Sequence, residues 1–205
     1  MKSFDEHLRA SAEQHGHLCA GQYIGVRMAR MGLRELGIDE PENYRDLIVF
    51  IENDRCLADA VSSVTGCKLG RRRLKYRDYG KSAASFLDLA TGKAVRISST
   101  RWISPPENNG AHGHGGGHSG SGAAHSHNDN DGLRAFFDAL TDNDLFKVER
   151  VSIALPPEDM PGKPAQKVTC ARCGEIVTDK RQVEAGGETL CRSCAGNSYY
   201  TVLKE

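Results

Sequence analysis

The chain has no excess of charge of either sign, because its 205 residues carry 27 Lys and Arg against 27 Asp and Glu. This balance argues against non-specific binding to nucleic acid or to an acidic membrane surface. It also has no apolar run near the roughly 18 residues that a membrane-spanning helix needs. Residues 1–6 lack the hydrophobic centre of a signal peptide. We therefore expect a cytoplasmic protein without a membrane segment, for which nucleic acid is an unlikely partner.

Several catalytic motifs are also absent. The sequence contains no Gly-x-x-x-x-Gly-Lys-Ser/Thr phosphate loop, no His-Glu-x-x-His motif and no Gly-x-Ser-x-Gly motif. A zinc deaminase is disfavoured too, because no His-x-Glu precedes a Pro-Cys-x-x-Cys. Cysteines and histidines therefore remain as the residues most capable of chemistry.

The strongest pattern present is a pair of Cys-x-x-Cys motifs near the C-terminal end. Cys170 and Cys173 are followed, after 17 residues, by Cys191 and Cys194. Two such pairs can hold one tetrahedral ion, and four sulfur ligands are typical of a structural zinc site. The alternatives are two disulfides or a dithiol redox motif, although thioredoxin-like chemistry uses one pair in a βαβ setting. The odd total of 7 cysteines suits a reducing interior.

The patterning ahead of these motifs predicts a core that mixes helices and strands. Residues 3–6 have capping-box spacing, and a longer helix is expected over 18–36. A strand is predicted at 47–51, then a helix capped by Asp54, and β structure over 69–102. Small residues recur on one face of the long helix, so another backbone can approach it closely: Gly21, Gly25, Ala29 and Gly32.

A second group of candidate ligands lies at two predicted helix starts. A thiol at such a start, as at Cys19 and Cys56, is favoured as a thiolate by the helix dipole and free N–H groups. His17 can share a metal with Cys19 or carry a proton, and Asp59 can orient a ligand. If the two starts converge, the imidazole and the two sulfurs form a site for a soft transition metal. Alternatively, each cysteine, and Cys67 in particular, is a small buried apolar residue.

Two further patterns each have two interpretations. Alternation along a predicted strand gives one basic face, which either binds an anion such as a pterin phosphate or is simply solvated: Arg71, Arg73, Lys75 and Arg77. Residues 104–131 are rich in Gly, Ser, Asn and His, which predicts a mobile insertion. Its histidines would bind nickel, copper or zinc, or the insertion is a spacer. We expect a core at 1–155, a linker at 156–166 and a zinc finger at 167–205.

Four motifs together resemble the FmdE family, which is linked to molybdenum and tungsten formylmethanofuran dehydrogenase. They are His15-Gly-His-Leu-Cys-Ala-Gly, Cys56-Leu-Ala-Asp-Ala, Thr65-Gly-Cys with Gly70, and Asp78-Tyr-Gly-Lys. The resemblance implies an α+β core, a homodimer, and a cleft that holds His17, Cys19 and Cys56. Some members also carry a treble-clef zinc finger, in which Cys170 and Cys173 would form the knuckle and Cys191 and Cys194 would begin the helix.

The resemblance implies a metal-binding accessory protein of molybdenum- or tungsten-dependent one-carbon oxidoreductases, with oxidoreductase subunits as partners. Its cofactors would be structural zinc and an unidentified transition metal in the core. Candidate catalytic residues are Cys19, His17, Cys56 and Asp59. One alternative is a regulatory or protein-interaction module with a ligand-sensing core, since the charges of the finger are nearly balanced. The other is a metallochaperone that uses the histidine-rich insertion.

Overall fold

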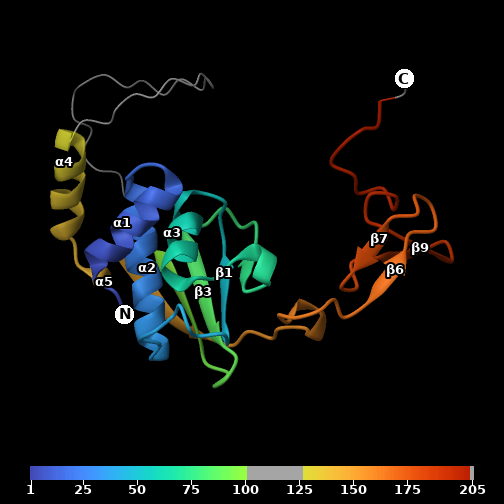
Figure 1. Cartoon of the computed structure of the whole chain (residues 1–205), viewed down its shortest axis with the longest axis horizontal. Coiled ribbons are helices and arrows are strands. Elements are labelled where there is room, and N and C mark those ends of the chain that lie inside the picture. The colour runs from blue at the N-terminus through green and yellow to red at the C-terminus, as the bar shows by residue number, and fades with distance from the viewer. Residues whose placement is uncertain (101–126, 204–205) are drawn as a thin grey trace. The chain divides into compact units, whose positions relative to one another are not determined.

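The computed structural model describes residues 1–100 and 127–203 (Figure 1). The chain divides into two units, Met1–Ile153 and Ala154–Glu205. Most of the predicted insertion at 104–131 lies outside the described residues, so its predicted mobility and metal binding stay predictions. Helices and strands mix in the first unit, which confirms the predicted α+β class. No helix in the part of the chain that is described is long and apolar enough to span a bilayer.

The first two helices form where the sequence predicts them. α1 (Phe4–His15) begins with a capping box, in which Ser3 Oγ accepts a hydrogen bond from the backbone N–H of Glu6 at 3.2 Å. In return, the Glu6 carboxylate accepts one from the Ser3 N–H at 2.7 Å. α2 (Ala20–Leu36) starts slightly later than predicted, so that Cys19 is its N-cap residue.

A five-stranded sheet in the order β2-β1-β3-β4-β5 supports these helices. β1 runs parallel to β2, and all other neighbours are antiparallel. The central strands are apolar and buried, as the run at 47–51 predicts. The strands are β1 (Leu47–Ile51), β2 (Leu74–Tyr76), β3 (Ala83–Asp88), β4 (Ala94–Ser99) and β5 (Phe146–Val151). The remaining elements of this unit are α3 (Cys56–Thr65), the 3₁₀ turn η1 (Leu69–Arg71), α4 (His127–Asp138) and α5 (Asp142–Leu145).

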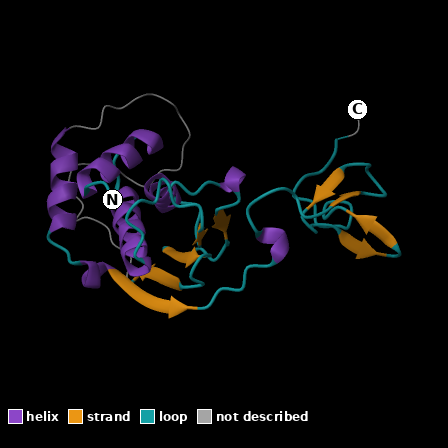
Figure 2. Cartoon of the chain, turned by 60° about the horizontal axis from the view of Figure 1, so that its bottom comes forward, coloured by secondary structure: helices purple, strands orange, loops and turns teal. Residues whose placement is uncertain are grey.

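The helices α1, α2 and α3 gather beside the sheet (Figures 1 and 2), and α2 packs on both α3 and the sheet. The small face of α2 permits this packing. A Cβ added at Gly25 would lie 2.5 Å from the Cβ of Ala60 and 2.9 Å from the carbonyl oxygen of Leu57. At Gly32 it would lie 2.5 Å from the ring of Phe86. The predicted close approach is therefore confirmed, with α3 and β3 as the elements that approach.

The start of α3 differs from the prediction. Arg55, rather than Asp54, is the N-cap residue, and its side chain makes no capping hydrogen bond. The Asn53 side-chain oxygen accepts a hydrogen bond from the Arg55 N–H at 3.3 Å. The side chain of Asn53 thus stabilises the turn before the helix, and Asp54 instead lines a neighbouring cavity.

Helix α4 begins at His127, inside the predicted insertion and before the expected start at Leu133. Arg27 of α2 fixes its C-terminal end by donating hydrogen bonds to the carbonyl oxygens of Phe137 and Leu140, both at 2.9 Å. Arg27 also pairs with Asp142 at 2.7 Å. A cation that satisfies the last carbonyls of a helix stabilises that end.

The second unit consists of two small hairpins and a 3₁₀ turn. β6 (Lys167–Thr169) pairs with β7 (Ile176–Thr178), and β8 (Val183–Ala185) pairs with β9 (Glu188–Leu190). The turn η2 (Pro157–Asp159) lies ahead of them. Where the treble-clef resemblance implies a helix, residues 192–196 form a turn. Gly196 has a φ of 95°, a left-handed conformation that ends the turn.

The contact between α2 and α3 predicts the effect of adding one methyl group. Gly25→Ala should lower the free energy of unfolding by about 1–3 kcal/mol, because the new Cβ meets α3 and the packed helices must shift. Gly132→Ala in α4 is the matched control, since nothing lies within 4 Å of its added Cβ. The control should gain up to about 1 kcal/mol from helix propensity. Urea unfolding measures both, and equal stabilities would contradict the proposed contact.

Two candidate metal centres

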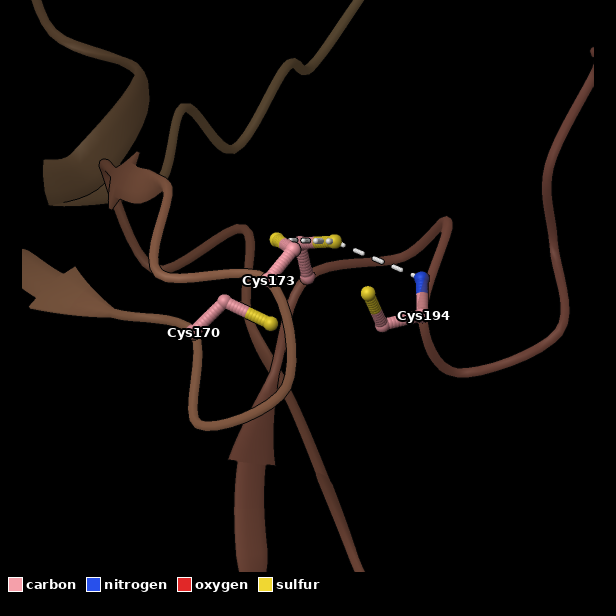
Figure 3. Close-up of side chains that lie close together, drawn as sticks. Cys170, Cys173 and Cys194 are labelled. Atoms are coloured by element: carbon pink, nitrogen blue, oxygen red, sulfur yellow. Dashed lines mark hydrogen bonds between the residues drawn. The ribbon is translucent and has the colours of Figure 1, made fainter. Parts of the chain in front are cut away.

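Four cysteine sulfurs come together in the second unit. Cys170 follows β6 and Cys173 lies in the turn before β7, whereas Cys191 and Cys194 follow β9. All four Sγ atoms lie within 4.8 Å of one another, and the side chains drawn in Figure 3 converge on one small region. The Sγ atoms of Cys173 and Cys191 are 3.9 Å apart. In a tetrahedral site with Zn–S bonds of about 2.3 Å, neighbouring sulfurs lie about 3.8 Å apart.

Backbone hydrogen bonds shape the two turns that present these sulfurs. The Gly174 N–H donates to the carbonyl oxygen of Cys170 at 2.9 Å. In the second turn the Cys194 N–H points at the Cys191 sulfur, 3.3 Å away. Arg172 joins the turns by donating to the Cys194 carbonyl oxygen at 2.7 Å. Local hydrogen bonds thus fix the shape of each turn, and the Arg172 side chain connects the two turns.

Backbone groups and neighbouring thiols influence the ionisation of these cysteines. Backbone N–H groups of Cys173 and Cys191 lower the pKa of Cys170 to about 6. The Cys191 side chain and burial raise the pKa of Cys194 to about 12. Thiolates this close repel one another, so they do not all ionise near neutral pH unless a cation lies among them. The four cysteines therefore form a site that can bind a metal ion.

A second cluster lies in the first unit, where α1 ends and α2 begins. His15 is the last residue of α1, His17 lies in the connection, and Cys19 is the N-cap of α2. One ligand atom from each of the three lies within 4.8 Å of the others. The imidazole rings of His15 and His17 have centroids 4.7 Å apart.

Cys56, in the first turn of α3, lies next to this cluster. Its side chain is close enough to influence the ionisation of the Cys19 thiol. Gly21 lies beside both cysteines. A Cβ added there would be 2.7 Å from the Cys56 Cβ and 3.7 Å from the Cys19 Sγ. The two helix starts therefore meet, which is the condition for a shared site.

His15 is the member of the cluster that was not selected as a candidate. Its Nδ1 lies 2.8 Å from a carboxylate oxygen of Asp59, which holds the ring from α3. Its Nε2 is buried and has no hydrogen-bond partner within the described residues. A carboxylate on Nδ1 favours the tautomer that keeps the Nε2 lone pair available, which is the usual arrangement of a metal-binding histidine. The spacing of His15 and His17 in the sequence could have identified His15 as a candidate ligand.

Gln22 is a second residue that sequence reasoning missed. It is fully buried in α2, its Nε2 donates to the Cys56 carbonyl oxygen at 2.9 Å, and its Oε1 accepts a hydrogen bond from Ser11 of α1. A buried amide that satisfies both of its ends fixes three helices in one arrangement. Gln22 lies on the same face of the predicted helix as Gly25, and a polar residue on that buried face could have identified it.

The structure corrects the predicted ionisation of Cys19. Burial, and then the neighbouring Cys56, raise the pKa of Cys19, although the N–H groups of Gln22 and Gly21 act in the opposite direction. The predicted lowering is therefore wrong, because the helix-start effect is smaller than the burial effect. Cys67 lies outside the cluster: it is fully buried, its Sγ donates to the Leu47 carbonyl oxygen at 3.5 Å, and burial raises its pKa.

The predicted basic line does not form. Arg71 belongs to η1 rather than to a strand. Arg73 is buried and donates to the carbonyl oxygens of Tyr44 at 2.8 Å and Gly66 at 3.2 Å, so it supports the fold. Lys75 lines a cavity and Arg77 lies over the Phe50 ring. The prediction failed because β2 is only three residues long, too short to align four side chains.

Comparison with known proteins finds a family model that matches part of this chain. The family model described as "FmdE, Molybdenum formylmethanofuran dehydrogenase operon" matches residues 14–115, which include the whole core cluster. Over these residues the chain matches the FmdE family, and the resemblance of its motifs is confirmed.

Two individual proteins are similar to this chain. A "Probable S-adenosyl-L-methionine-binding protein" of Archaeoglobus fulgidus is 38% identical over 93 residues, which are 44% of this chain. The match spans only 25% of that relative. The crystal structure of a tungsten formylmethanofuran dehydrogenase FmdE-like protein from Syntrophus aciditrophicus is 24% identical, with a TM-score of 0.55. The similarity covers 98% of this chain and 96% of that one, and it supports the fold.

The four-cysteine centre predicts a loss of metal from one substitution. Cys170→Ser should remove one equivalent of bound metal per chain, because a neutral hydroxyl replaces a buried thiolate ligand. Ser193→Ala is the matched control, since Ser193 lies between Cys191 and Cys194 and its hydroxyl contacts Tyr200 instead. Native mass spectrometry of the full chain measures the stoichiometry. Unchanged metal in Cys170→Ser would show that the cluster is not a metal site.

Proposed function

We propose that this chain is a metal-binding accessory protein of formylmethanofuran dehydrogenase-type one-carbon redox metabolism. In this proposal the four cysteines of the second unit hold zinc and have a structural role. A transition metal is held in the core by His15, His17, Cys19 and Cys56. Molybdenum- or tungsten-dependent oxidoreductase subunits are the proposed partners, and a homodimer is the proposed assembly. The operon named in the family description supports the choice of partner.

One observation carries the core assignment: the buried Nε2 of His15 has no partner among the described residues, while Nδ1 contacts Asp59. A buried nitrogen that is left unpaired costs about 1–3 kcal/mol. A metal at this position would satisfy it without any rearrangement of the ring, because Asp59 already fixes the ring. His17 and Cys19 provide further donor atoms within 4.8 Å.

The donor set determines which ions fit. Two imidazoles and two thiolates suit zinc, copper(I), or other soft and borderline ions over magnesium or calcium, which prefer oxygen. When bound, such an ion would supply Lewis-acid or redox chemistry. Of the candidate catalytic residues, His17, Cys19 and Cys56 then act as ligands. Asp59 acts as a positioning residue, since its carboxylate contacts His15.

The central test is the metal content of the full chain purified without oxygen. The wild-type protein should hold two metal equivalents, and Cys19→Ser should hold one. Cys67→Ala is the matched control, because Cys67 is buried outside both clusters. It should lose stability but keep both ions. Elemental analysis gives the counts. Identical counts in the wild-type protein and Cys19→Ser would contradict the core metal site.

The partner is tested in the same preparations. Anaerobic affinity purification from the native host should recover molybdenum- or tungsten-dependent oxidoreductase subunits with the wild-type chain. Recovery of none of these subunits would remove the accessory role while leaving the metal sites unaffected.

The contact between His15 and Asp59 predicts a weaker core site when the carboxylate is removed. Asp59→Ala should reduce the core metal affinity by about 10–100-fold, the usual effect of losing a group that orients a ligand. Asp54→Ala, a nearby carboxylate without a contact to His15, should leave the affinity unchanged. Competition with a coloured chelator measures both. Equal affinities in the two variants would refute the positioning role.

A further inference from the structure

A cavity of about 410 Å³ lies between α3 and the edge strand β2. One wall is a single face of α3, formed by Arg55, Ala58, Asp59 and Ser62, whose spacing places them on the same side of a helix. The opposite wall comes from η1 and β2, with Lys68, Leu69 and Tyr76 among its residues. The volume lies within the range of about 300–1,000 Å³ that is typical of small-molecule sites.

The charged residues that line the cavity leave it with a small positive excess, which favours an anion. Three are cations, Arg55, Lys68 and Lys75, and two are carboxylates, Asp54 and Asp59. Arg55 and Lys68 are both exposed, so each can reach a ligand. Lys75 is only 9% exposed, so its charge acts in a wall from which water is largely excluded. Cations in such a wall attract an anionic group more strongly than cations on an open surface.

The remaining lining favours a ligand with an apolar body. Ile51, Ala58, Leu69 and Leu74 contribute aliphatic surface, and the ring of Tyr76 lies at the same cavity. A bare inorganic anion would leave this surface wet, whereas a flat organic anion would cover it and still reach the cations.

Asp59 connects the cavity with the core cluster. Asp59 lines the cavity, and its carboxylate contacts His15 Nδ1 at 2.8 Å. Because His15 belongs to the cluster with His17 and Cys19, the cavity ends beside the proposed metal.

We propose that this cavity binds a small organic anion, a carboxylate or phosphate on an apolar or aromatic body, as the ligand or substrate presented to the core centre. The placement beside the metal rests on the proposed function, whereas the binding itself depends only on the cavity. The cations hold the acidic group, and the aliphatic wall covers the body.

Benzoate, phenyl phosphate and benzamide test this directly by calorimetry on the full chain. Benzoate or phenyl phosphate should bind, and the stronger of the two identifies the acidic group. Neutral benzamide, which has the shape of benzoate, should bind at least about tenfold more weakly, a difference of about 1.4 kcal/mol. Equal binding of benzamide and both anions, or no binding of either anion at millimolar concentration, would overturn the proposal.

Two charge variants locate the site. Lys68→Gln and Arg55→Gln should each weaken binding of the preferred anion about tenfold, since each removes one charge-assisted contact. Lys93→Gln is the matched control, because Lys93 lines a different cavity at β4 and β5. If all three variants bind alike, the anion site lies elsewhere and the proposal fails.

Metal analysis of the same samples separates this proposal from the proposed function. Lys68→Gln should keep the wild-type metal content, because Lys68 is not a ligand of either centre. Anion binding without any core metal would contradict the proposed function alone. A normal core metal without anion binding would contradict only the inference drawn from the cavity.

Discussion

The close approach of α2 to α3 is the constraint that makes the core centre possible. Glycine at 21 and 25 lets the two helices meet at a distance that a methyl group would prevent. The buried amide of Gln22 then holds the start of α3 to α2 and, through Ser11, to α1. These contacts bring Cys19 and Cys56 together, although they are far apart in sequence. Without such packing the glycines would only weaken the helix. They stand where the contact with α3 requires a residue without a side chain.

The two candidate metal centres are built in different ways. In the second unit, two tight turns at the ends of small hairpins present all four sulfurs, so the geometry is largely local. In the first unit, the donors come from the end of one helix, a connection and the starts of two others. The Asp59 contact with His15 adds a positioning group from α3. A small unit with little core would gain stability from a metal bound at such a site, whereas the helical core is held by its own packing.

The edge of the sheet borders the cavity beside α3. β2 is short, and η1 precedes it directly, so a space remains between this edge and α3. The cations that surround this space come from a helix start, a loop and a strand. The predicted line of alternating basic residues is replaced by side chains with separate roles. Arg73 supports carbonyl oxygens of the fold, Arg77 lies over an aromatic ring, and Lys75 lines the cavity.

Features with local causes could be predicted from the order of the residues alone. These are the capping box at Ser3, the small face of α2, the apolar run of β1 and the spacing of the four C-terminal cysteines, each set by neighbours within a few residues. The same patterns indicated His17, Cys19, Cys56 and Asp59 as candidates. The folded chain was needed to show that the two helix starts meet and that His15 joins them. It was also needed to show that burial raises the Cys19 pKa, that Arg73 supports the fold, and that a cavity lies beside Asp59. Burial and contacts between distant segments arise from packing, and the local pattern of residues does not specify them.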